Sequence, residues 1–492
     1  MQGRILHIAL GGALLAGGAA SAQEIKARPE QLSYPSLTYT VPDAKALHAT
    51  LANGITVYIA EDRLLPLVSV QVFFRGGRYL EPAGKEGVAG LTATVWRTGG
   101  AGALDPKQLD EELDFLAAQL ATSVGDVTGS VSLNLLAKDV DRGLELLMDV
   151  LRSPRFDEAR LAKAKEDMLS DMKRRNDDAA DIEEREWNRL VYGDDYWLNH
   201  LATRATVDGI TRDDLVAFHH RIAAPVNIVV AVSGDFQRTE MLARLDKTLG
   251  AWKEKGQAVP PVPQPGAGAA PGVYLVNKAD VNQGRVSIGH PGARRPVADE
   301  HAMNVANDIL GGGGFTAWMM LRIRSDEGLA YGAYSSYEIG DLYPGEFRAY
   351  FQSKSSTCVR AAKLTLDLVK KIRSDDVAAK ELDTSKSSFV ETFPRTFETK
   401  VRTVNRFALD DLVGRPHDYW TTYRDRMRAV TAADVKAAAT AHLAPEKLIV
   451  LVVGNVDEIL KGHPDYPDLK LDMFGKLNRV PLRDPMTLKP LE

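Results

Sequence analysis

One stretch of the chain has the spacing of a zinc-binding motif but none of the side chains that bind zinc. The inverted motif His-x-x-Glu-His places two imidazoles four residues apart on one helical face, with a general base beside the second. In RYLEPAGKEGVAGLTATVWRTGG, which starts at Arg78, the three working positions fall on Gly90, Ala93 and Thr94. Glycine and alanine offer no lone pair or titratable proton, and a threonine hydroxyl is a poor zinc ligand. The ten histidines form no such motif in either direction, so the chain is predicted not to run zinc-dependent hydrolysis by itself.

Length and composition are typical of a soluble protein with more than one domain. A chain of 492 residues is too long for a single core, and 45% hydrophobic with 26% charged residues is ordinary for globular proteins. The net charge of −5 and the lack of a basic block argue against nucleic-acid binding. The only cysteine, Cys358, excludes an internal disulfide.

The first residues have the pattern of a secretory signal peptide. Arg4 precedes a weakly apolar run, which closes in Ala20-Ser21-Ala22 before Gln23, a small-x-small cleavage site. The alternative is a membrane anchor, but about fifteen small residues do not span a hydrocarbon layer of roughly 30 Å. We therefore expect cleavage after Ala22 and a soluble periplasmic protein without a membrane anchor.

A proline-rich segment divides the rest of the chain into two related halves. Gln257–Gly272 has five prolines among glycine and alanine, the composition of an exposed, partly stiff linker. Gly209–Asp235 and Ala429–Asn455 match without a gap, with four shared residues at one constant offset. These pairs are Thr211 and Thr431, Asp214 and Asp434, Pro225 and Pro445, and Gly234 and Gly454. Each copy predicts a capped helix, a turn at proline and a buried strand that stops at glycine, which indicates duplication.

Between these blocks, runs of helical spacing follow runs of strand-like alternation. Val68 to Phe74 alternates as a half-buried strand, and Asp105-Pro106 is a typical helix start. This order favours an α+β fold over a doubly wound parallel sheet. We expect two homologous halves, each of two similar subdomains with an antiparallel sheet and helices, arranged as a clamshell. The predicted divisions are a signal peptide at 1–22, a first half at 23–256, a linker at 257–272, a second half at 273–461 and a surface tail at 462–492.

The second half contains a glycine-rich turn followed by Arg324 and by Gly328-Leu329-Ala330-Tyr331. Together with the frame around Gly90, the duplicated blocks and the linker, this pattern resembles the pitrilysin/insulinase family of zinc metallopeptidases, which includes the mitochondrial processing peptidase. The resemblance covers nearly all of the chain after the leader. It implies a zinc site in the first half, and an Arg/Tyr pair from the second half that closes over a peptide substrate.

The resemblance assigns roles to residues of both halves. It implies that Arg324 and Tyr331 contact the substrate and the transition state, because guanidinium grips peptide carbonyls and a phenol hydroxyl can donate to an oxyanion. The alternative is an exposed helical arginine and a packed tyrosine. The family's third zinc ligand, a glutamate, corresponds to Asp171 here, so every position of the zinc site is altered.

Two interpretations of the glycine-rich turn remain open. The turn consists of Gly311, Gly312, Gly313 and Gly314. It is similar to the glycine-rich loop by which the non-catalytic subunit of the mitochondrial processing peptidase touches substrate, although it is shorter, so the resemblance implies that these glycines bind substrate. The turn is equally well explained as a flexible strand-to-helix connection. A phosphate-binding loop is disfavoured, because no Lys-Ser/Thr follows the glycines.

Loss of the whole zinc site beside a retained Arg/Tyr pair predicts a non-catalytic, substrate-binding subunit of a heterodimeric periplasmic zinc metallopeptidase that degrades or processes peptides. We expect no cofactor on this chain, zinc on a homologous partner subunit, and proteolysis only in the presence of that partner. The alternative is a peptidase-like structural or binding protein with no proteolytic role. A solitary hydrolase has no support, because the sequence shows no Ser/His/Asp or Cys/His arrangement.

Overall fold

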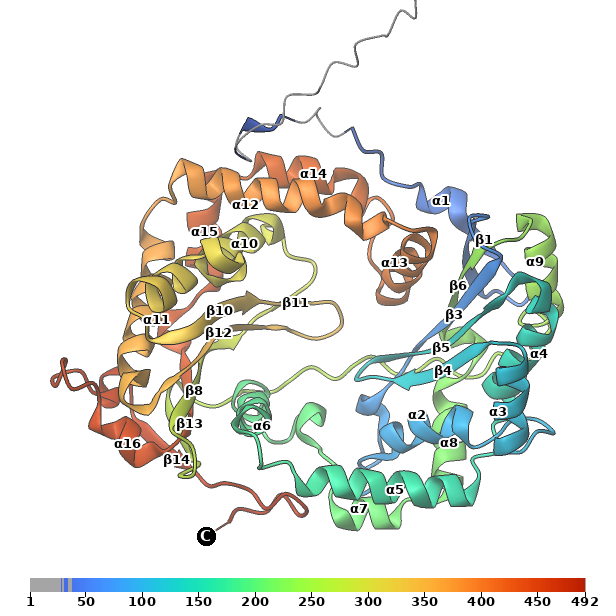
Figure 1. Cartoon of the computed structure of the whole chain (residues 1–492), viewed down its shortest axis with the longest axis horizontal. Helices are drawn as coiled ribbons and strands as arrows, with labels where there is room; N and C mark the ends of the chain where they lie inside the picture. Colours follow the sequence, from blue (N-terminus) through green and yellow to red (C-terminus); the bar gives the residue numbers. More distant parts are fainter. Residues whose placement is uncertain (1–27, 29–30, 34–37, 492) are drawn as a thin grey trace, which may run out of the picture. The chain divides into compact units, whose positions relative to one another are not determined.

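The computed structural model describes residues 28, 31–33 and 38–491 (Figure 1). The contacts within the chain divide it into two units, Met1–Tyr39 and Thr40–Glu492. Both predicted halves belong to the second unit. The predicted signal peptide, residues 1–22, lies outside the described residues. Within the described residues, no helix is both long enough and apolar enough to cross a membrane.

The first half is built on one six-stranded sheet, with strand order β1-β2-β6-β3-β5-β4. β2 and β6 are parallel, and the other neighbours are antiparallel. The strands are β1 (His48–Thr50), β2 (Thr56–Glu61), β3 (Leu67–Arg75), β4 (Gln119–Val124), β5 (Thr128–Leu136) and β6 (Ile228–Gly234). The helices are α1 (Ala44–Leu47), α2 (Val88–Thr98), α3 (Pro106–Phe115), α4 (Val140–Arg152), α5 (Glu158–Lys173), α6 (Ala179–Tyr192), α7 (Arg204–Gly209), α8 (Arg212–Ile222) and α9 (Arg238–Lys247).

The second half repeats this plan, with strand order β10-β12-β8-β13-β7-β14. The strands are β7 (Gly272–Asn277), β8 (Gln283–Pro291), β10 (Ala330–Tyr337), β12 (Glu346–Lys354), β13 (Ile449–Gly454) and β14 (Leu477–Val480), with a separate pair formed by β9 (Ala293–Arg294) and β11 (Ile339–Gly340). The helices are α10 (Glu300–Asn307), α11 (Cys358–Ser374), α12 (Ala379–Thr392), α13 (Lys400–Val413), α14 (Tyr419–Ala429), α15 (Ala432–His442) and α16 (Val456–Lys461). The α+β class and the two homologous halves are confirmed. The expectation of two similar subdomains in each half is corrected, because each half contributes one large sheet with its helices.

The duplicated sequence blocks form the same local structure in both halves. Thr211 and Thr431 each cap a helix, α8 and α15, through a reciprocal box with an aspartate three residues on. Pro225 and Pro445 each open a short 3₁₀ turn that leads into a completely buried strand, β6 or β13. Both strands lie inside their sheets, which explains why their sequences are apolar without alternation.

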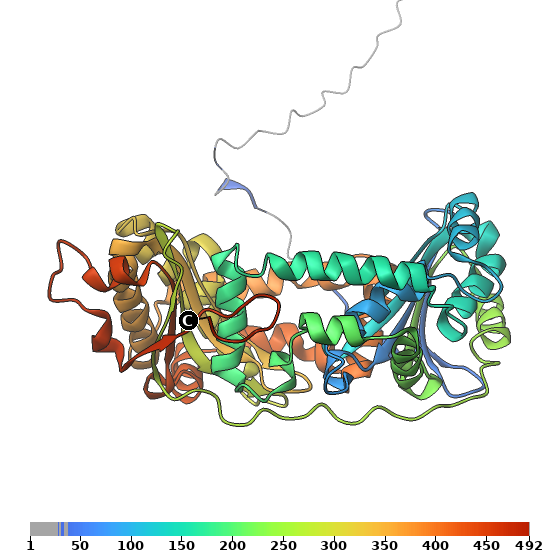
Figure 2. The ribbon, with the colours of Figure 1, turned by 90° about the horizontal axis from the view of Figure 1, so that it is seen from below.

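The segments outside the repeats connect the halves. Residues 252–270 form no helix or strand, and they run from the first half to β7 (Figure 2). The hydroxyls of Tyr79 and Tyr196 donate to the carbonyls of Pro260 (2.8 Å) and Pro263 (2.9 Å), so this predicted linker is held against the first half.

The C-terminal tail, which the sequence predicts to lie on the surface, also completes the second sheet. Its strand β14 pairs in parallel with β7. An unpaired β7 would present a row of free backbone groups, and the tail satisfies them. Beyond β14, Asn176 and Arg175 of the first half donate to the carbonyls of Arg483 and Pro485.

The two halves exchange equivalent helices. α6 belongs to the first half but packs on β8 and β13 of the second sheet, and α13 of the second half packs on β2, β3 and β6 of the first (Figure 1). The apolar side of α6, including Ile182, Trp187 and Val191, forms one buried cluster with Leu451 and Val453 of β13. At α13, the guanidinium of Arg75 on β3 donates to the carbonyls of Leu412 (2.8 Å) and Asp411 (3.1 Å). These are orphan carbonyls of the last helical turn, where a cation is favoured.

Polar side chains fix the position of α6 on the second sheet. Glu183 is fully buried, and its carboxylate accepts from the Ser287 hydroxyl (2.6 Å) and pairs with Arg285. The Trp187 indole N–H donates to the Glu346 carboxylate at the start of β12 (2.8 Å). A buried carboxylate is tolerated only when it is paired in this way, so these contacts specify one position of the helix.

We predict that Glu346 makes the protein less stable as pH rises. Burial raises the pKa of Glu346 from 4.5 to about 7, although Arg348 and the Trp187 hydrogen bond oppose the shift. Because the folded-state pKa lies above the unfolded value, the stability from the neutral acid is fully present below about pH 4.5 and is lost through pH 7. Glu346→Gln keeps an acceptor for Trp187, so it should match the parent at pH 4 and exceed it by about 1–3 kcal/mol at pH 8.

Denaturant unfolding at both pH values measures this difference. Glu240→Gln, at an exposed position of α9, is the matched control and should leave the profile unchanged. Identical pH profiles for the parent and Glu346→Gln would contradict the assignment.

Candidate functional site

The helix that carries the zinc-motif frame is α2, and its start is held by a half-buried carboxylate. Glu81 lies just before the helix and accepts from the backbone N–H groups of Gly87 (3.0 Å) and Ala89 (2.8 Å). Burial raises the pKa of Glu81 to about 7, while these two hydrogen bonds oppose the shift. α2 then packs against α5, α8 and β4. The frame read from the sequence is therefore a real structural unit.

The working positions of this frame offer no metal-binding chemistry. Gly90 and Thr94 are exposed and Ala93 is half-buried, as expected for positions on one outward helical face. The Thr94 hydroxyl donates to the Gly90 carbonyl (3.0 Å), so it is engaged by the helix itself. The Ala93 carbonyl accepts from the Thr122 hydroxyl of β4 (2.7 Å). Among these three positions, the only polar side-chain group is thus the Thr94 hydroxyl, which already has a hydrogen-bond partner.

Asp171, the position matched to the third ligand, lies on α5, which packs against α2. A Cβ placed on Gly90 would lie 3.3 Å from the Met168 methyl group, one turn before Asp171. The Asp171 side chain is 73% exposed and pairs with Arg174. In the part of the chain that the structure describes, no three His, Cys, Asp or Glu residues are grouped to hold a metal ion. The donor set around α2 does not fit zinc.

The structure brings Arg324 and Tyr331 together. Arg324 lies on a π-helical segment, η8 (Met320–Asp326), and Tyr331 follows at the start of β10. The guanidinium carbon of Arg324 lies 5.0 Å from the centroid of the Tyr331 ring and 4.8 Å from that of Phe315, so the cation lies close to both rings. Tyr331 is 88% exposed and Phe315 71% exposed. The alternative of a packed tyrosine is therefore wrong, and both aromatic rings are open to a binding partner.

The glycine-rich segment lies between helical segments, which corrects the alternative of a strand-to-helix connection. Gly311 and Gly312 are the last two residues of a π-helical turn, η6 (Asp308–Gly312). Gly311 is buried, and a Cβ there would lie 2.4 Å from the backbone nitrogen of Ser335 on β10. Gly312 is exposed, and a Cβ there would lie 2.8 Å from the side-chain nitrogen of Asn307. The close approach of this turn to β10 thus requires glycine at position 311. Gly312 presents its backbone to solvent.

The other two glycines close this turn and open the next. Gly313 is half-buried, and its N–H donates to the Asp308 carbonyl oxygen (2.7 Å). A Cβ placed on Gly313 would lie only 2.7 Å from the same oxygen, which is too close. Gly314 opens a short 3₁₀ turn with φ +62°. Both glycines are therefore explained by the local backbone, and a contact of the four glycines with substrate stays a prediction. The segment leads directly into Phe315, and so positions the ring that stacks on Arg324.

Tyr331 lies at a groove of about 370 Å³ on the second sheet. Tyr334 of β10 and Tyr350 of β12 lie directly opposite each other, with ring centroids 5.8 Å apart. The groove is lined by Gln283, Arg285, Gly328, Leu329, Ala330, Tyr331, Gly332, Tyr334, Tyr350, Phe351, Gln352, Ser353 and Lys354. Sequence reasoning missed Phe315, Tyr334, Tyr350 and Lys354 as site residues, because only strand pairing and the fold of the glycine-rich turn bring them to Tyr331.

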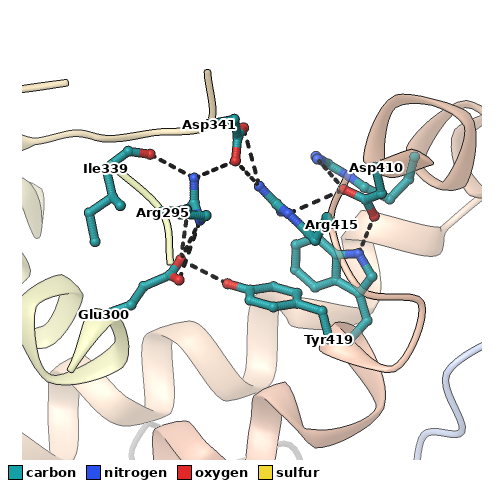
Figure 3. Close-up of polar contacts among 9 residues, drawn as sticks. Arg295, Glu300, Ile339, Asp341, Asp410, Arg415 and Tyr419 are labelled. Atoms are coloured by element: carbon teal, nitrogen blue, oxygen red, sulfur yellow. Dashed lines mark hydrogen bonds and ion pairs between the residues drawn. The ribbon is translucent and has the colours of Figure 1, made fainter. Parts of the chain in front are cut away.

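A cluster of charged side chains holds the loop after β11 to α13 and α14 (Figure 3). Its ion pairs are Arg295 with Glu300 (2.7 Å), Arg295 with Asp341 (2.8 Å), Arg415 with Asp341 (3.1 Å) and Arg415 with Asp410 (3.5 Å). Burial raises the pKa of Asp410, and the Tyr419 hydroxyl donates to Glu300 (2.9 Å). Every carboxylate in the cluster has an arginine partner, so the cluster is a structural brace.

Comparison with known sequences gives the same family. Residues 209–389 match the family described as the peptidase M16 inactive domain. The non-peptidase homolog YmxG of Helicobacter pylori is 25% identical over 412 residues, 82% of this chain and 92% of the relative. The uncharacterized zinc protease YmxG of Bacillus subtilis is 20% identical over 82% of this chain and 97% of its own length.

Solved structures show the same fold. A peptidase M16 inactive domain from Pseudomonas fluorescens superposes with a TM-score of 0.75 at 24% identity, over 83% of this chain and 97% of that one. The periplasmic protease PqqL from Escherichia coli gives 0.73 at 16% identity, over 90% of this chain and 49% of that one. The resemblance to the pitrilysin/insulinase peptidases is thus confirmed, and residues 209–389 of the chain match the inactive domain of the peptidase M16 family.

Proposed function

We propose that this chain is the non-catalytic, substrate-binding subunit of a heterodimeric periplasmic zinc metallopeptidase. The observation that carries the proposal is the contrast between two sites on one chain. None of the three zinc-motif positions on α2 carries an imidazole or a carboxylate, whereas Arg324 lies against the exposed rings of Tyr331 and Phe315. The proposed partner is a homologous subunit that supplies the zinc ion and the general base.

In this proposal the residues of the chain bind and orient a peptide. The Arg324 guanidinium donates to peptide carbonyl oxygens, and its planar fork can hold two at once. The Tyr331 hydroxyl donates a hydrogen bond to the carbonyl oxygen on which negative charge develops. The groove beside Tyr331 extends the contact with an extended peptide. The glycine-rich segment adds a contact through the exposed backbone of Gly312, three residues before Phe315.

We predict that the chain purified alone contains no stoichiometric zinc and cleaves no peptide. Gly90 and Ala93 carry no donor, and Asp171 is an exposed carboxylate already paired with Arg174. Elemental analysis after purification without chelators measures the metal content. One zinc ion per chain, lost on Asp171→Ala, would overturn this expectation.

Turnover should appear when a zinc-bearing partner is added, and Tyr331→Phe should then lower it about 10²–10³-fold. The change removes one hydroxyl donor but keeps the ring that stacks on Arg324, so assembly should be intact. Arg324→Ala should weaken substrate binding as well, because its contacts form before the transition state. Tyr466→Phe, at another exposed tyrosine of the same half, is the matched control.

Reconstitution with each variant, followed by turnover and co-elution, tests this proposal. Unchanged turnover for Tyr331→Phe in an assembled complex would show that the chain is a scaffold. Co-purification with a membrane complex, or a stable homodimer without a zinc-bearing partner, would favour the alternative of a peptidase-like structural protein.

We predict that the protein is exported to the periplasm and that its leader is removed. Cleavage after Ala22 leaves Gln23 as the first residue, and the intact mass of protein from the periplasmic fraction measures it. Ala22→Asp removes the small residue at the cleavage site and should keep the leader attached. Retention of Met1–Ala22 in the parent protein would contradict this prediction.

A further inference from the structure

The groove beside Tyr331 lacks acidic residues. None of the described residues that line it is Asp or Glu, whereas Arg285 and Lys354 are both cationic. Tyrosine hydroxyls, the amides of Gln283 and Gln352 and the Ser353 hydroxyl supply the remaining side-chain polarity. The surface that a ligand meets in this groove therefore carries positive charge and hydrogen-bond donors.

Two cations at this groove have no carboxylate partner. Arg285 is already paired with the buried Glu183. By contrast, Lys354 is exposed, and within the described part of the chain it forms no ion pair or side-chain hydrogen bond. Arg324, stacked on the Tyr331 ring that lines the groove, likewise has only its two aromatic contacts there. Nearby acids are engaged elsewhere, since Glu327 pairs with Arg322 and Arg360.

A neighbouring hollow of about 470 Å³ has carboxyl groups, which the described residues of the groove lack. It shares Arg285 and Tyr350 with the groove, so the two are continuous over the same sheet. Four carboxyl groups line it, those of Asp126, Glu184, Glu338 and Glu346. Glu184 and Asp126 in this hollow are already paired with Arg348 and Arg78, whereas Lys354 in the groove has no acidic partner among the described residues. The groove is therefore the more favourable place on this sheet for an acidic group of a peptide.

We propose that the groove beside Tyr331 binds the carboxylate of a peptide, with Lys354 and Arg324 as its cationic partners. The carboxylate is either the free C-terminus or an acidic side chain, because both present the same two oxygens. The inference rests on the proposed peptide-binding function and adds the class of substrate to it. Lys354 then acts as a specificity-determining residue.

Peptide binding to the full chain alone, measured by fluorescence anisotropy, tests this inference without a zinc-bearing partner. The probes are one Ala/Gly-rich octapeptide, labelled with an uncharged fluorophore, as its free acid, the same peptide as its C-terminal amide, and two amides with a central Glu or Gln. At least one carboxylate-bearing probe should bind about tenfold more tightly than its neutral counterpart. Comparing the free acid with the Glu-containing amide identifies the source of the carboxylate. Added salt should reduce the difference, because exposed charges are screened.

Variants of Lys354 test whether the preference for a carboxylate arises in the groove. Lys354→Gln should remove most of the preference for the carboxylate while leaving the neutral amide unaffected, and Lys354→Arg should keep the preference. Lys380→Gln removes the same charge from an exposed position of α12 and should behave as the parent. Equal binding of acidic and neutral peptides, or equal weakening of both by Lys354→Gln, overturns the inference but leaves the substrate-binding role standing. Failure of every probe to bind overturns both.

Discussion

The exchange of α6 and α13 between the halves is the constraint on which the rest of the unit depends. Each half places its own helices against one face of its sheet, but the opposite face receives a helix from the other half. Without α6, the apolar side chains of β13 on that face would be exposed to water, and Ser287 and Arg285 of β8 would lose the Glu183 carboxylate as their partner. The halves are therefore one cooperative structure, and the linker connects parts that are already fastened together.

The same exchange determines the electrostatics of the candidate site. Arg285 and Arg348 point from the second sheet toward α6, where Glu183 and Glu184 pair with them. Arg348 also stacks near both Trp187 of α6 and Tyr350 of the groove. Because these arginines are neutralised by the first half, the free positive charge near Tyr331 is left to Arg324 and Lys354. A site formed by the second half is thus tuned by a helix from the first.

The features that the sequence predicts correctly are those with a local physical cause. The caps at Thr211 and Thr431, the prolines that follow them and the buried strands that end at glycine depend on neighbours a few residues away. The start of α3 at Pro106, with Asp105 as its cap, is of the same kind. The helix exchange, the pairing of β14 with β7 and the meeting of Tyr334 with Tyr350 depend on residues far apart in the chain. Residue spacing and composition do not reveal such long-range contacts. The sequence therefore predicts two subdomains in each half, whereas each half forms a single large sheet.

The solvent exposure of a side chain indicates whether the fold requires it. On α2, Gly90 and Thr94 are exposed, so their presence in place of ligands leaves the packing intact, while the half-buried Glu81 still holds the start of the helix. The frame therefore persists without its chemistry. Phe315 and Tyr331 present the opposite case, since two large aromatic rings lie in water and contribute little to any core. Their stacking with Arg324 adds a modest stability, about 0.5–1 kcal/mol for an exposed cation–π contact. Packing gives no sufficient reason for rings so exposed, whereas the proposed contact with a peptide would account for them.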